Sequence, residues 1–189
     1  IKMYENLPAT GVFEPGSIIK PFVYAGAMEA GVYKGDSLYS SGKISLGRDG
    51  KGGLTQTYSG DPNTIWTVND ALGNNWGMIS LDEGLIRSSN TAIIDLLTKY
   101  YNVDANIKNL KNFGFFKPVE IYGMNTSAGS LPADENDVLS KYTLGFGQGI
   151  TGNASCTQRW GQIRYPRTFR ARLVSHEAVV CPLLQSSYP

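Results

Sequence analysis

Cysteine, histidine and long apolar runs are scarce in this sequence. It holds two cysteines, Cys156 and Cys181, and one histidine, His176, among 189 residues. These are too few ligands for a four-coordinate zinc site, and two cysteines alone do not establish a disulfide. No apolar run approaches the roughly 18 residues of a membrane-spanning helix. A zinc-binding module and a membrane span within these residues are therefore excluded.

Charged residues are also few, at 17% of the sequence, whereas hydrophobic residues make up 41%. This balance excludes a disordered acidic or basic chain. A length of 189 residues is enough for one domain with its own core but not for two. Residues 1–8 lack the basic, apolar and small-residue regions of a signal peptide. If a parent protein is exported, we expect its targeting signal to lie outside this sequence.

Lysine is missing from the last 38 residues, where the composition changes abruptly. Residues 1–151 hold 12 basic and 15 acidic residues, which gives a net charge of −3. Residues 152–189 hold five basic residues and one acidic residue, which gives a net charge of +4. The change predicts a domain over residues 1–151 and a separate basic tail over residues 152–189. The basic residues of the tail are all arginine: Arg159, Arg164, Arg167, Arg170 and Arg172.

Apolar periodicity predicts a helix that begins near Ser17 and ends at Gly31. Pro21 fits a helix only in its first turn, where the amide groups have no partners within the helix, so it fixes the start near the serine. The Gly- and Ser-rich stretch that follows is expected to be mostly loop, with short strands at residues 43–46 and 54–58.

Capping signals predict further helices in the middle of the chain. A serine or threonine followed three residues later by a carboxylate is typical of a helix start, because each side chain can satisfy a free backbone amide of the first turn. Asparagine and aspartate serve as single caps. The predicted starts are Thr67-x-x-Asp70, Ser80-x-x-Glu83, Asn90 and Asp104, the last for a helix that ends at Gly114.

Ser17 and Lys20 place a hydroxyl and an amine on one face of the first turn of the predicted helix. A serine hydroxyl is a poor nucleophile unless a base accepts its proton. Lysine, with a reference pKa of about 10.4, becomes a base only where burial or nearby charge favours its neutral form. The pair is a candidate nucleophile and base. The alternative is a serine that caps the helix beside a surface lysine.

The second candidate is Ser88-Ser89-Asn90, which supplies two hydroxyls and an amide between two predicted helices. The alternative interpretation is the cap of the second helix, a role that suits Ser89 or Asn90. A glycine-rich turn at residues 145–149 lacks the lysine and the Ser or Thr of a phosphate-binding loop. We therefore reject nucleotide binding.

Four segments, taken together, resemble a known family. In order and approximate spacing they are similar to the transpeptidase domain of class B penicillin-binding proteins, most closely to the division type. The resemblance covers residues 5–151. The segments are Glu14-Pro15-Gly16-Ser17-Ile18-Ile19-Lys20, Ser88-Ser89-Asn90-Thr91-Ala92, Ala128-Gly129-Ser130-Leu131-Pro132-Ala133-Asp134 and Gly145-Phe146-Gly147-Gln148-Gly149-Ile150.

The resemblance implies a serine acyltransferase that cross-links peptidoglycan. Ser17 is then the nucleophile that attacks a stem peptide ending in D-Ala-D-Ala, and Lys20 is its general base. Ser88 relays a proton to the leaving group, and Asn90 binds the substrate amide. β-Lactam antibiotics would acylate the same serine. The resemblance implies no metal and no organic cofactor.

The resemblance also implies the setting and the fold of a parent protein. The parent is expected at the cell membrane, with this domain on the extracytoplasmic face and with cell-wall synthesis or division proteins as partners; no nucleic acid partner is expected. The implied fold is α+β, with an antiparallel sheet flanked by helices, an all-helical lobe, and the active site between them.

This chain keeps the segments of the helical lobe and lacks the later strands, so we expect a mainly α structure with few strands. The apolar side chains that would face the missing sheet should then be partly exposed, which would weaken the burial of Lys20. These side chains are Ile18, Phe22, Val23 and Met28.

One motif of the family is absent from the sequence. In the family, a lysine followed by Ser or Thr and Gly lies on a strand whose backbone amide completes the oxyanion hole and whose side chains hold the substrate carboxylate. No such tripeptide occurs here, and the sequence departs from the family after Thr151. We hypothesise that the reading frame shifted near codon 151 of a parent gene. Sequencing the locus tests this, because an intact in-frame tail would disprove it.

The alternative for the tail is a genuine basic segment. Its Trp160, Tyr165 and Phe169 alternate with arginines, as in segments that bind nucleic acids or anionic membranes.

Three functions are compatible with the sequence. They are a transpeptidase domain that is truncated here, a β-lactam-sensing module that is acylated without turnover, and a fragment with no function of its own. The first two need the same Ser17 and Lys20. A carboxypeptidase or β-lactamase is less favoured because no dedicated deacylating carboxylate is evident, although Asp134 and Glu135 lie near a family motif. As it stands, the chain is expected to be inactive as a transpeptidase.

Overall fold

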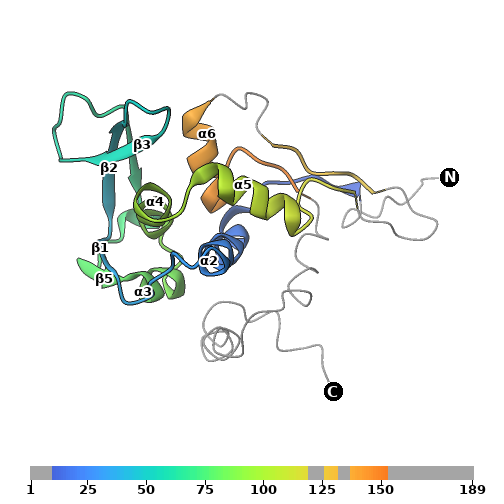
Figure 1. The fold of residues 1–189 in the computed structure, drawn as a ribbon, viewed down its shortest axis with the longest axis horizontal. Helices are drawn as coiled ribbons and strands as arrows, with labels where there is room; N and C mark the ends of the chain where they lie inside the picture. Colours follow the sequence, from blue (N-terminus) through green and yellow to red (C-terminus); the bar gives the residue numbers. More distant parts are fainter. Residues whose placement is uncertain (1–9, 119–125, 132–136, 153–189) are drawn as a thin grey trace, which may run out of the picture.

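The computed structural model describes residues 10–118, 126–131 and 137–152, and this part of the chain consists of short helices around two small sheets (Figure 1). None of these helices is long and apolar enough to cross a membrane. The helices are α2 Lys20–Glu29, α3 Leu81–Ile86, α4 Asn90–Lys99, α5 Val103–Asn112 and α6 Val138–Thr143, with 3₁₀ turns η1 Gly16–Ile19, η2 Ala71–Gly73 and η3 Leu144–Phe146. The strands are β1 Leu38–Ser40, β2 Lys43–Arg48, β3 Leu54–Thr57, β4 Trp66–Asn69 and β5 Met78–Ser80.

Both sheets are antiparallel. Strand β2 lies at the centre of a three-stranded sheet, and its Ser45 pairs with Thr57 of β3 on one side and Thr67 of β4 on the other. Strands β1 and β5 form a separate two-stranded sheet. Among the described residues, helices outweigh strands and no sheet has more than three strands. The predicted α+β class, with a mainly α composition in this chain, is confirmed.

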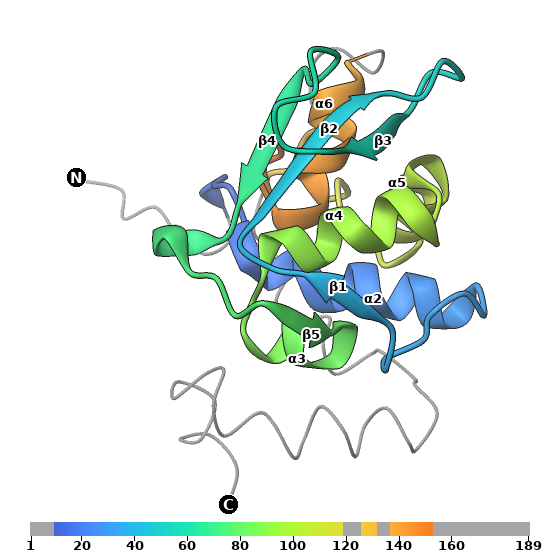
Figure 2. The same cartoon turned by 90° about the vertical axis from the view of Figure 1, so that its left-hand side faces the viewer.

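Helix α4 is the centre of the packing. Figures 1 and 2 show it between the three-stranded sheet and helix α2. Every residue from Thr91 to Leu97 is buried, and Ile93, Ile94 and Leu96 are completely so. Full burial of one such side chain contributes roughly 1.5–3 kcal/mol. The start of α4, where the Ser88-Ser89-Asn90 segment lies, is therefore fixed by the core.

The predicted first helix is confirmed. The turn η1 continues directly into α2, and Pro21 lies in the first turn of α2. Gly31 follows the helix with a φ of 71°, the left-handed conformation that commonly ends helices. The helix start predicted at Ser80 is also confirmed, since Ser80 Oγ accepts a hydrogen bond from the Glu83 amide at 3.1 Å. The two strands expected in the Gly- and Ser-rich stretch are found as β2 and β3.

The capping box predicted at Thr67-x-x-Asp70 is wrong. Thr67 lies in β4, where it pairs with Ser45 of β2. Only the 3₁₀ turn η2 follows Asp70, because its carboxylate accepts hydrogen bonds from distant residues and not from an amide of the first turn. Strand pairing overrides the local capping pattern here.

Two other helices begin slightly earlier than predicted. Helix α4 is capped by Ser89, whose Oγ accepts a hydrogen bond from the Ala92 amide at 3.0 Å, so Asn90 is the first helical residue and not the cap. Helix α5 is capped by Asn102, whose side chain accepts from the Asp104 amide at 2.8 Å. Asp104 therefore lies within the first turn.

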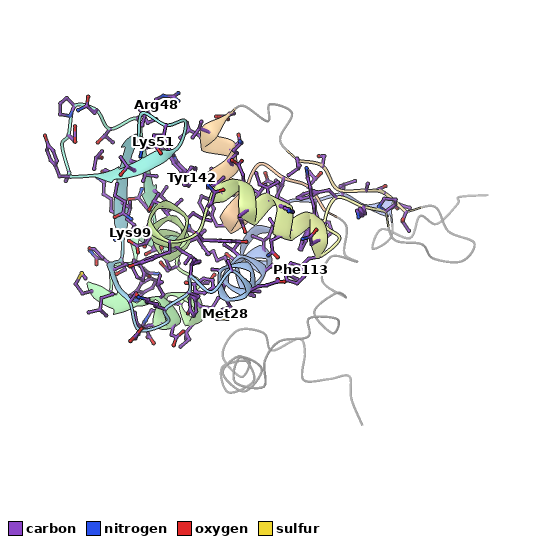
Figure 3. All side chains as sticks on the ribbon, viewed as in Figure 1. Met28, Arg48, Lys51, Lys99, Phe113 and Tyr142 are labelled. Atoms are coloured by element: carbon purple, nitrogen blue, oxygen red, sulfur yellow. The ribbon has the colours of Figure 1, made fainter. Side chains whose placement is uncertain are left out.

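The apolar face of α2 is covered more completely than expected. Phe22 and Val23 are fully buried, so the prediction that they would be partly exposed is wrong. Phe22 packs edge-on against Phe113 and Phe115, with 5.2 and 4.9 Å between ring centroids, and Figure 3 shows Phe113 beside α2. The segment after α5 thus covers this face without later strands. The other two side chains are partly exposed, as predicted: Ile18 and Met28.

Candidate active site

The predicted nucleophile stands on a tight turn at the start of the first helix. Gly16 has a φ of 57°, a left-handed conformation that glycine adopts without strain. Its amide donates to the Gly147 carbonyl at 3.1 Å, and a Cβ on Gly147 would collide with the Gly16 carbonyl. Ser17, the next residue, is exposed. The glycine-rich turn at residues 145–149 therefore packs against the turn that carries Ser17.

Lys20 has the opposite environment, with 2% of its surface exposed. Its amine donates hydrogen bonds to the Ser88 carbonyl and, at 3.2 Å, to the Ser88 hydroxyl. Within the part of the chain that the structure describes, no carboxylate forms an ion pair with it. A hydroxyl and a carbonyl satisfy the hydrogen bonds of a lysine without fixing its positive charge as a carboxylate would.

The burial of Lys20 changes its proton affinity. Burial lowers the pKa of Lys20 from 10.5 to about 8, and the negative charge of nearby Asp70 opposes this shift. An amine with such a pKa is partly neutral near physiological pH and can accept a proton, which the predicted base must do. The expectation that the burial of Lys20 would be weakened in this chain is wrong, because the described helices already bury it.

Ser88 follows helix α3 in a conformation that usually belongs to glycine. Its φ of 53° lies in the left-handed region, where a Cβ costs roughly 1–2 kcal/mol. The Ser88 amide donates to the Leu85 carbonyl at 3.0 Å and the Ser89 amide to the Gly84 carbonyl at 2.8 Å, the two bonds of a Schellman cap. In this conformation the carbonyl and the hydroxyl of Ser88 both meet the Lys20 amine.

A buried carboxylate, Asp70, lies next to this turn with 3% of its surface exposed. Its Oδ1 accepts from the Ser89 hydroxyl at 2.9 Å and the Thr91 amide at 3.0 Å. Its Oδ2 accepts from the Thr91 hydroxyl at 2.7 Å and the Gly42 amide at 2.9 Å. Burial alone would raise the pKa of Asp70, but these hydrogen bonds outweigh it and hold the pKa below the usual value. Asp70 is therefore ionised at neutral pH.

Asn90 occupies the first position of α4. Its side-chain amide donates to the Asn69 carbonyl at 3.2 Å, which holds it against the end of β4. The predicted binder of the substrate amide is thus anchored to the strand that leads into Asp70.

The structure joins Lys20 to Ser88 across 68 positions of sequence, and Asn90 lies two residues further on. Ser17 is one helical turn from Lys20, whose backbone amide donates to the Ser17 carbonyl. Among the described residues, the hydrogen-bond partners of the Lys20 amine both belong to Ser88, and the Ser17 hydroxyl is not one of them.

Sequence reasoning missed Asp70 and gave Thr91 no role. Asp70 contacts Ser89 and Thr91 from 19 and 21 positions away, and no local pattern reports such contacts. The signal that was present, an acidic residue three positions after a threonine, was attributed to a helix cap.

Two backbone bridges join segments that lie far apart in the sequence. Phe13 and Gly152 form an antiparallel bridge with two backbone hydrogen bonds of 2.9 Å, and Ser130 forms another with Thr151. Both bridges are isolated and do not extend into a sheet. Asp134, Glu135 and the tail from residue 153 onward lie outside the described residues.

Comparison with known proteins assigns the family. The family model described as the penicillin-binding protein transpeptidase domain matches residues 1–159. The chain belongs to this family. A penicillin-binding protein 1A from Neisseria cinerea is 29% identical over 116 residues, which make up 61% of the chain but only 13% of that relative. The predicted transpeptidase resemblance is confirmed, while the domain boundary at residue 151 stays a prediction.

Solved structures of a peptidoglycan synthetase and of penicillin-binding proteins share the fold. A peptidoglycan synthetase from Bifidobacterium adolescentis is 25% identical with a TM-score of 0.64, over 82% of this chain and 26% of that one. The transpeptidase domain of penicillin-binding protein 3 from Burkholderia pseudomallei is 19% identical with a TM-score of 0.64, over 82% and 42%. A ceftriaxone acyl-enzyme of penicillin-binding protein A from M. tuberculosis is 18% identical with a TM-score of 0.63, over 81% and 32%. The chain spans less than half of each.

Proposed function

We propose that the chain carries the nucleophile and the base of a class B, division-type D,D-transpeptidase that cross-links peptidoglycan and is acylated by β-lactams. Membership of the penicillin-binding transpeptidase family supports the reaction class. The observation that carries the proposal is the buried Lys20 amine, which has a pKa of about 8 and is hydrogen-bonded to Ser88.

In the proposed acylation, Ser17 Oγ attacks the carbonyl carbon of the D-Ala-D-Ala bond and neutral Lys20 Nζ accepts its proton. The Ser17 backbone amide donates to the developing oxyanion. When the C–N bond breaks, Ser88 Oγ protonates the leaving nitrogen and recovers a proton from Lys20 over the 3.2 Å contact. The products are a Ser17 ester and free D-Ala, and Lys20 is neutral again.

In the second half, the amine of another stem peptide attacks the ester carbon. Lys20 accepts a proton from that amine and returns it to Ser17 Oγ as the C–O bond breaks, which leaves a cross-linked peptide. Asn90 holds the substrate amide in both halves. A β-lactam follows the first half only, because its leaving nitrogen stays tethered to the acyl group and obstructs the second amine.

As it stands, the chain acylates very slowly or not at all in this proposal. The Ser17 amide supplies one oxyanion donor, but the family's second donor belongs to the strand with the Lys-Ser/Thr-Gly motif, which the sequence lacks. The loss of one donor costs about 10²–10³ in rate. The substrate carboxylate also loses its anchor. The defect lies on the oxyanion side, since Lys20 is already buried.

The parent protein would be held at the cell membrane, with this domain on the extracytoplasmic face and cell-wall synthesis or division proteins beside it. Its substrates would be stem peptides ending in D-Ala-D-Ala. Residues 152–189 would be the product of a shifted reading frame, and a frame-restored parent is a protein in which the family sequence continues after residue 151.

Fluorescent penicillin tests the proposal in a frame-restored parent. The label is expected on Ser17 and should disappear in Ser17→Ala. Ser40 is a matched control, because Ser40 and Lys43 have the same spacing as Ser17 and Lys20, and Ser40→Ala should keep the label. Label that persists in Ser17→Ala, or that maps to another serine, would contradict the assignment.

A further inference from the structure

The proposed mechanism leaves out Asp70, although its carboxylate is buried against the turn that carries Ser88 and Asn90. A buried carboxylate is costly unless it is fully hydrogen-bonded. Each oxygen of Asp70 accepts two hydrogen bonds, and the donors come from the β1–β2 connection and the start of α4. This full set of partners indicates a residue that fixes the geometry of its neighbours.

We propose that Asp70 is the positioning residue of the active site: its carboxylate holds the Ser88-Ser89-Asn90 turn so that Ser88 keeps the left-handed conformation that directs it to the Lys20 amine. The inference rests on the proposed function for the roles of Ser88 and Lys20. Asp70 itself transfers no proton and touches no reacting atom.

The first argument is the strain at Ser88. Its φ of 53° is unfavourable for a residue with a Cβ, and such a conformation persists only where the surroundings determine it. On one side, Ser88 is held by the end of α3. On the other side, the Ser89 hydroxyl donates to Asp70 and accepts from the Tyr39 hydroxyl at 2.8 Å and from the Ala92 amide at 3.0 Å. Without Asp70, the Ser89 hydroxyl would lose its charged acceptor, and the α4 side of the turn would be held less firmly.

The second argument is the rigidity of the segment that carries Asp70. Its backbone amide donates to the Gly42 carbonyl at 3.0 Å, and its carboxylate accepts from the Gly42 amide at 2.9 Å. The preceding residue, Asn69, accepts from the Asn90 side chain at 3.2 Å. The turn is therefore bonded at two points to the end of a sheet strand. A strand fixes the positions of side chains more precisely than a loop does.

Asp95 offers a matched comparison. It is 1% exposed in helix α4 and accepts hydrogen bonds from Gln56 and Lys99, so it is also a buried carboxylate with polar partners. Its bonds lead to β3 and along α4, away from residues 88–90. If burial of a carboxylate near α4 were all that mattered, Asp70→Asn and Asp95→Asn would affect Ser88 alike.

The test compares glycine and alanine at position 88 in the 189-residue chain. Both substitutions remove the hydroxyl, and only glycine relieves a left-handed backbone. Ser88→Gly should therefore raise the folding equilibrium constant about two- to tenfold over Ser88→Ala, measured by urea unfolding. This ratio should fall to one or below when Asp70→Asn is added, because the turn has then relaxed. It should be unchanged with Asp95→Asn.

A spectroscopic readout accompanies the ratio. Well below pH 8 the Lys20 amine is protonated, and its ¹H–¹⁵N signal is expected because burial and the bonds to Ser88 slow its exchange with water. The signal should be lost in Asp70→Asn and kept in Asp95→Asn. Should Asp70→Asn not fold, Thr91→Val replaces it, since it removes one hydrogen bond to the same carboxylate and should lower both readouts in part.

The proposal is overturned if the glycine-to-alanine ratio or the Lys20 signal survives in Asp70→Asn, or if Asp95→Asn lowers them equally. Neither readout uses penicillin or a stem peptide. If the chain is not acylated, that result concerns the proposed function only. The test of Asp70 can still be carried out and can still fail.

Discussion

The two sides of the proposed active site are built to different degrees. On the base side, Lys20 is buried, bonded to Ser88 and adjacent to a carboxylate with four hydrogen bonds. On the nucleophile side, Ser17 is exposed and the neighbouring backbone segments meet in isolated bridges. Packing within the described part of the chain thus brings together the residues that we propose to transfer the proton. In the proposed function, the oxyanion half also needs the strand of the Lys-Ser/Thr-Gly motif, which this sequence lacks.

The first prediction tests the base side and has the largest expected effect. Lys20→Ala in a frame-restored parent should slow acylation by penicillin about 10²–10⁴-fold, since that is the usual value of a positioned proton transfer. Binding of the drug before acylation should be retained. Lys99→Ala is the control, because Lys99 is a helical lysine paired with Asp95, and it should leave the rate unchanged. An unaltered rate in Lys20→Ala would remove Lys20 from the role of base.

The second prediction tests the oxyanion side. The chain of 189 residues should acylate at least about 10²–10³-fold more slowly than a frame-restored parent, because one oxyanion donor is missing. Folding is first checked by circular dichroism, and acylation is then followed by intact mass. Stoichiometric labelling of Ser17 within minutes would show that the strand of the third motif matters far less than we propose.

The third prediction separates stability from catalysis at Lys20. The pKa falls from 10.5 to about 8 on folding, so the protonated amine destabilises the fold fully below pH 8, and this cost fades as the pH rises toward 10.5. The maximum cost corresponds to about 3 kcal/mol. Lys20→Met should therefore stabilise the chain most below pH 8 and progressively less above it.

Urea unfolding across this pH range provides the measurement. The control is Lys141→Met, which removes a surface pair with Asp104 and should show no such trend. A stabilisation by Lys20→Met that grows with pH would contradict the direction of the pKa shift.

The smallest effect is expected at the surface of α3, one residue before Ser88. Arg87 pairs with Glu83 at 2.7 Å, but both side chains are well exposed. Glu83→Gln should reduce the free energy of unfolding by about 0.3–0.5 kcal/mol, and added salt should remove the difference. A loss of several kcal/mol that added salt does not remove would contradict the assignment of Glu83 and Arg87 as an exposed pair.

Local signals predicted the parts of the site that depend on local structure. The position of Pro21 predicted the start of the first helix, and the pattern at Ser80 predicted the start of α3. Both signals act within a single helical turn. The spacing of Ser17 and Lys20 likewise indicated a shared helix face. These features need no knowledge of the tertiary fold.

The contacts that complete the base side could not be predicted in this way. Asp70 follows a strand that is defined by its pairing with β2, so its meeting with Ser89 and Thr91 is a consequence of sheet and helix packing. The burial of Phe22 by the residues after α5 is tertiary in the same sense, and expecting exposure there led to an underestimate of the burial of Lys20.

The most direct test of the central claim is a titration of Lys20 in the 189-residue chain, followed by the carbon-13 signal of its Cε and assigned by comparison with Lys20→Arg. A base side that is complete in this chain predicts a pKa of about 8. A midpoint at 10.5, the value of an unperturbed lysine, would mean that the amine is solvated and that the rest of the domain is needed to build the base as well as the oxyanion hole.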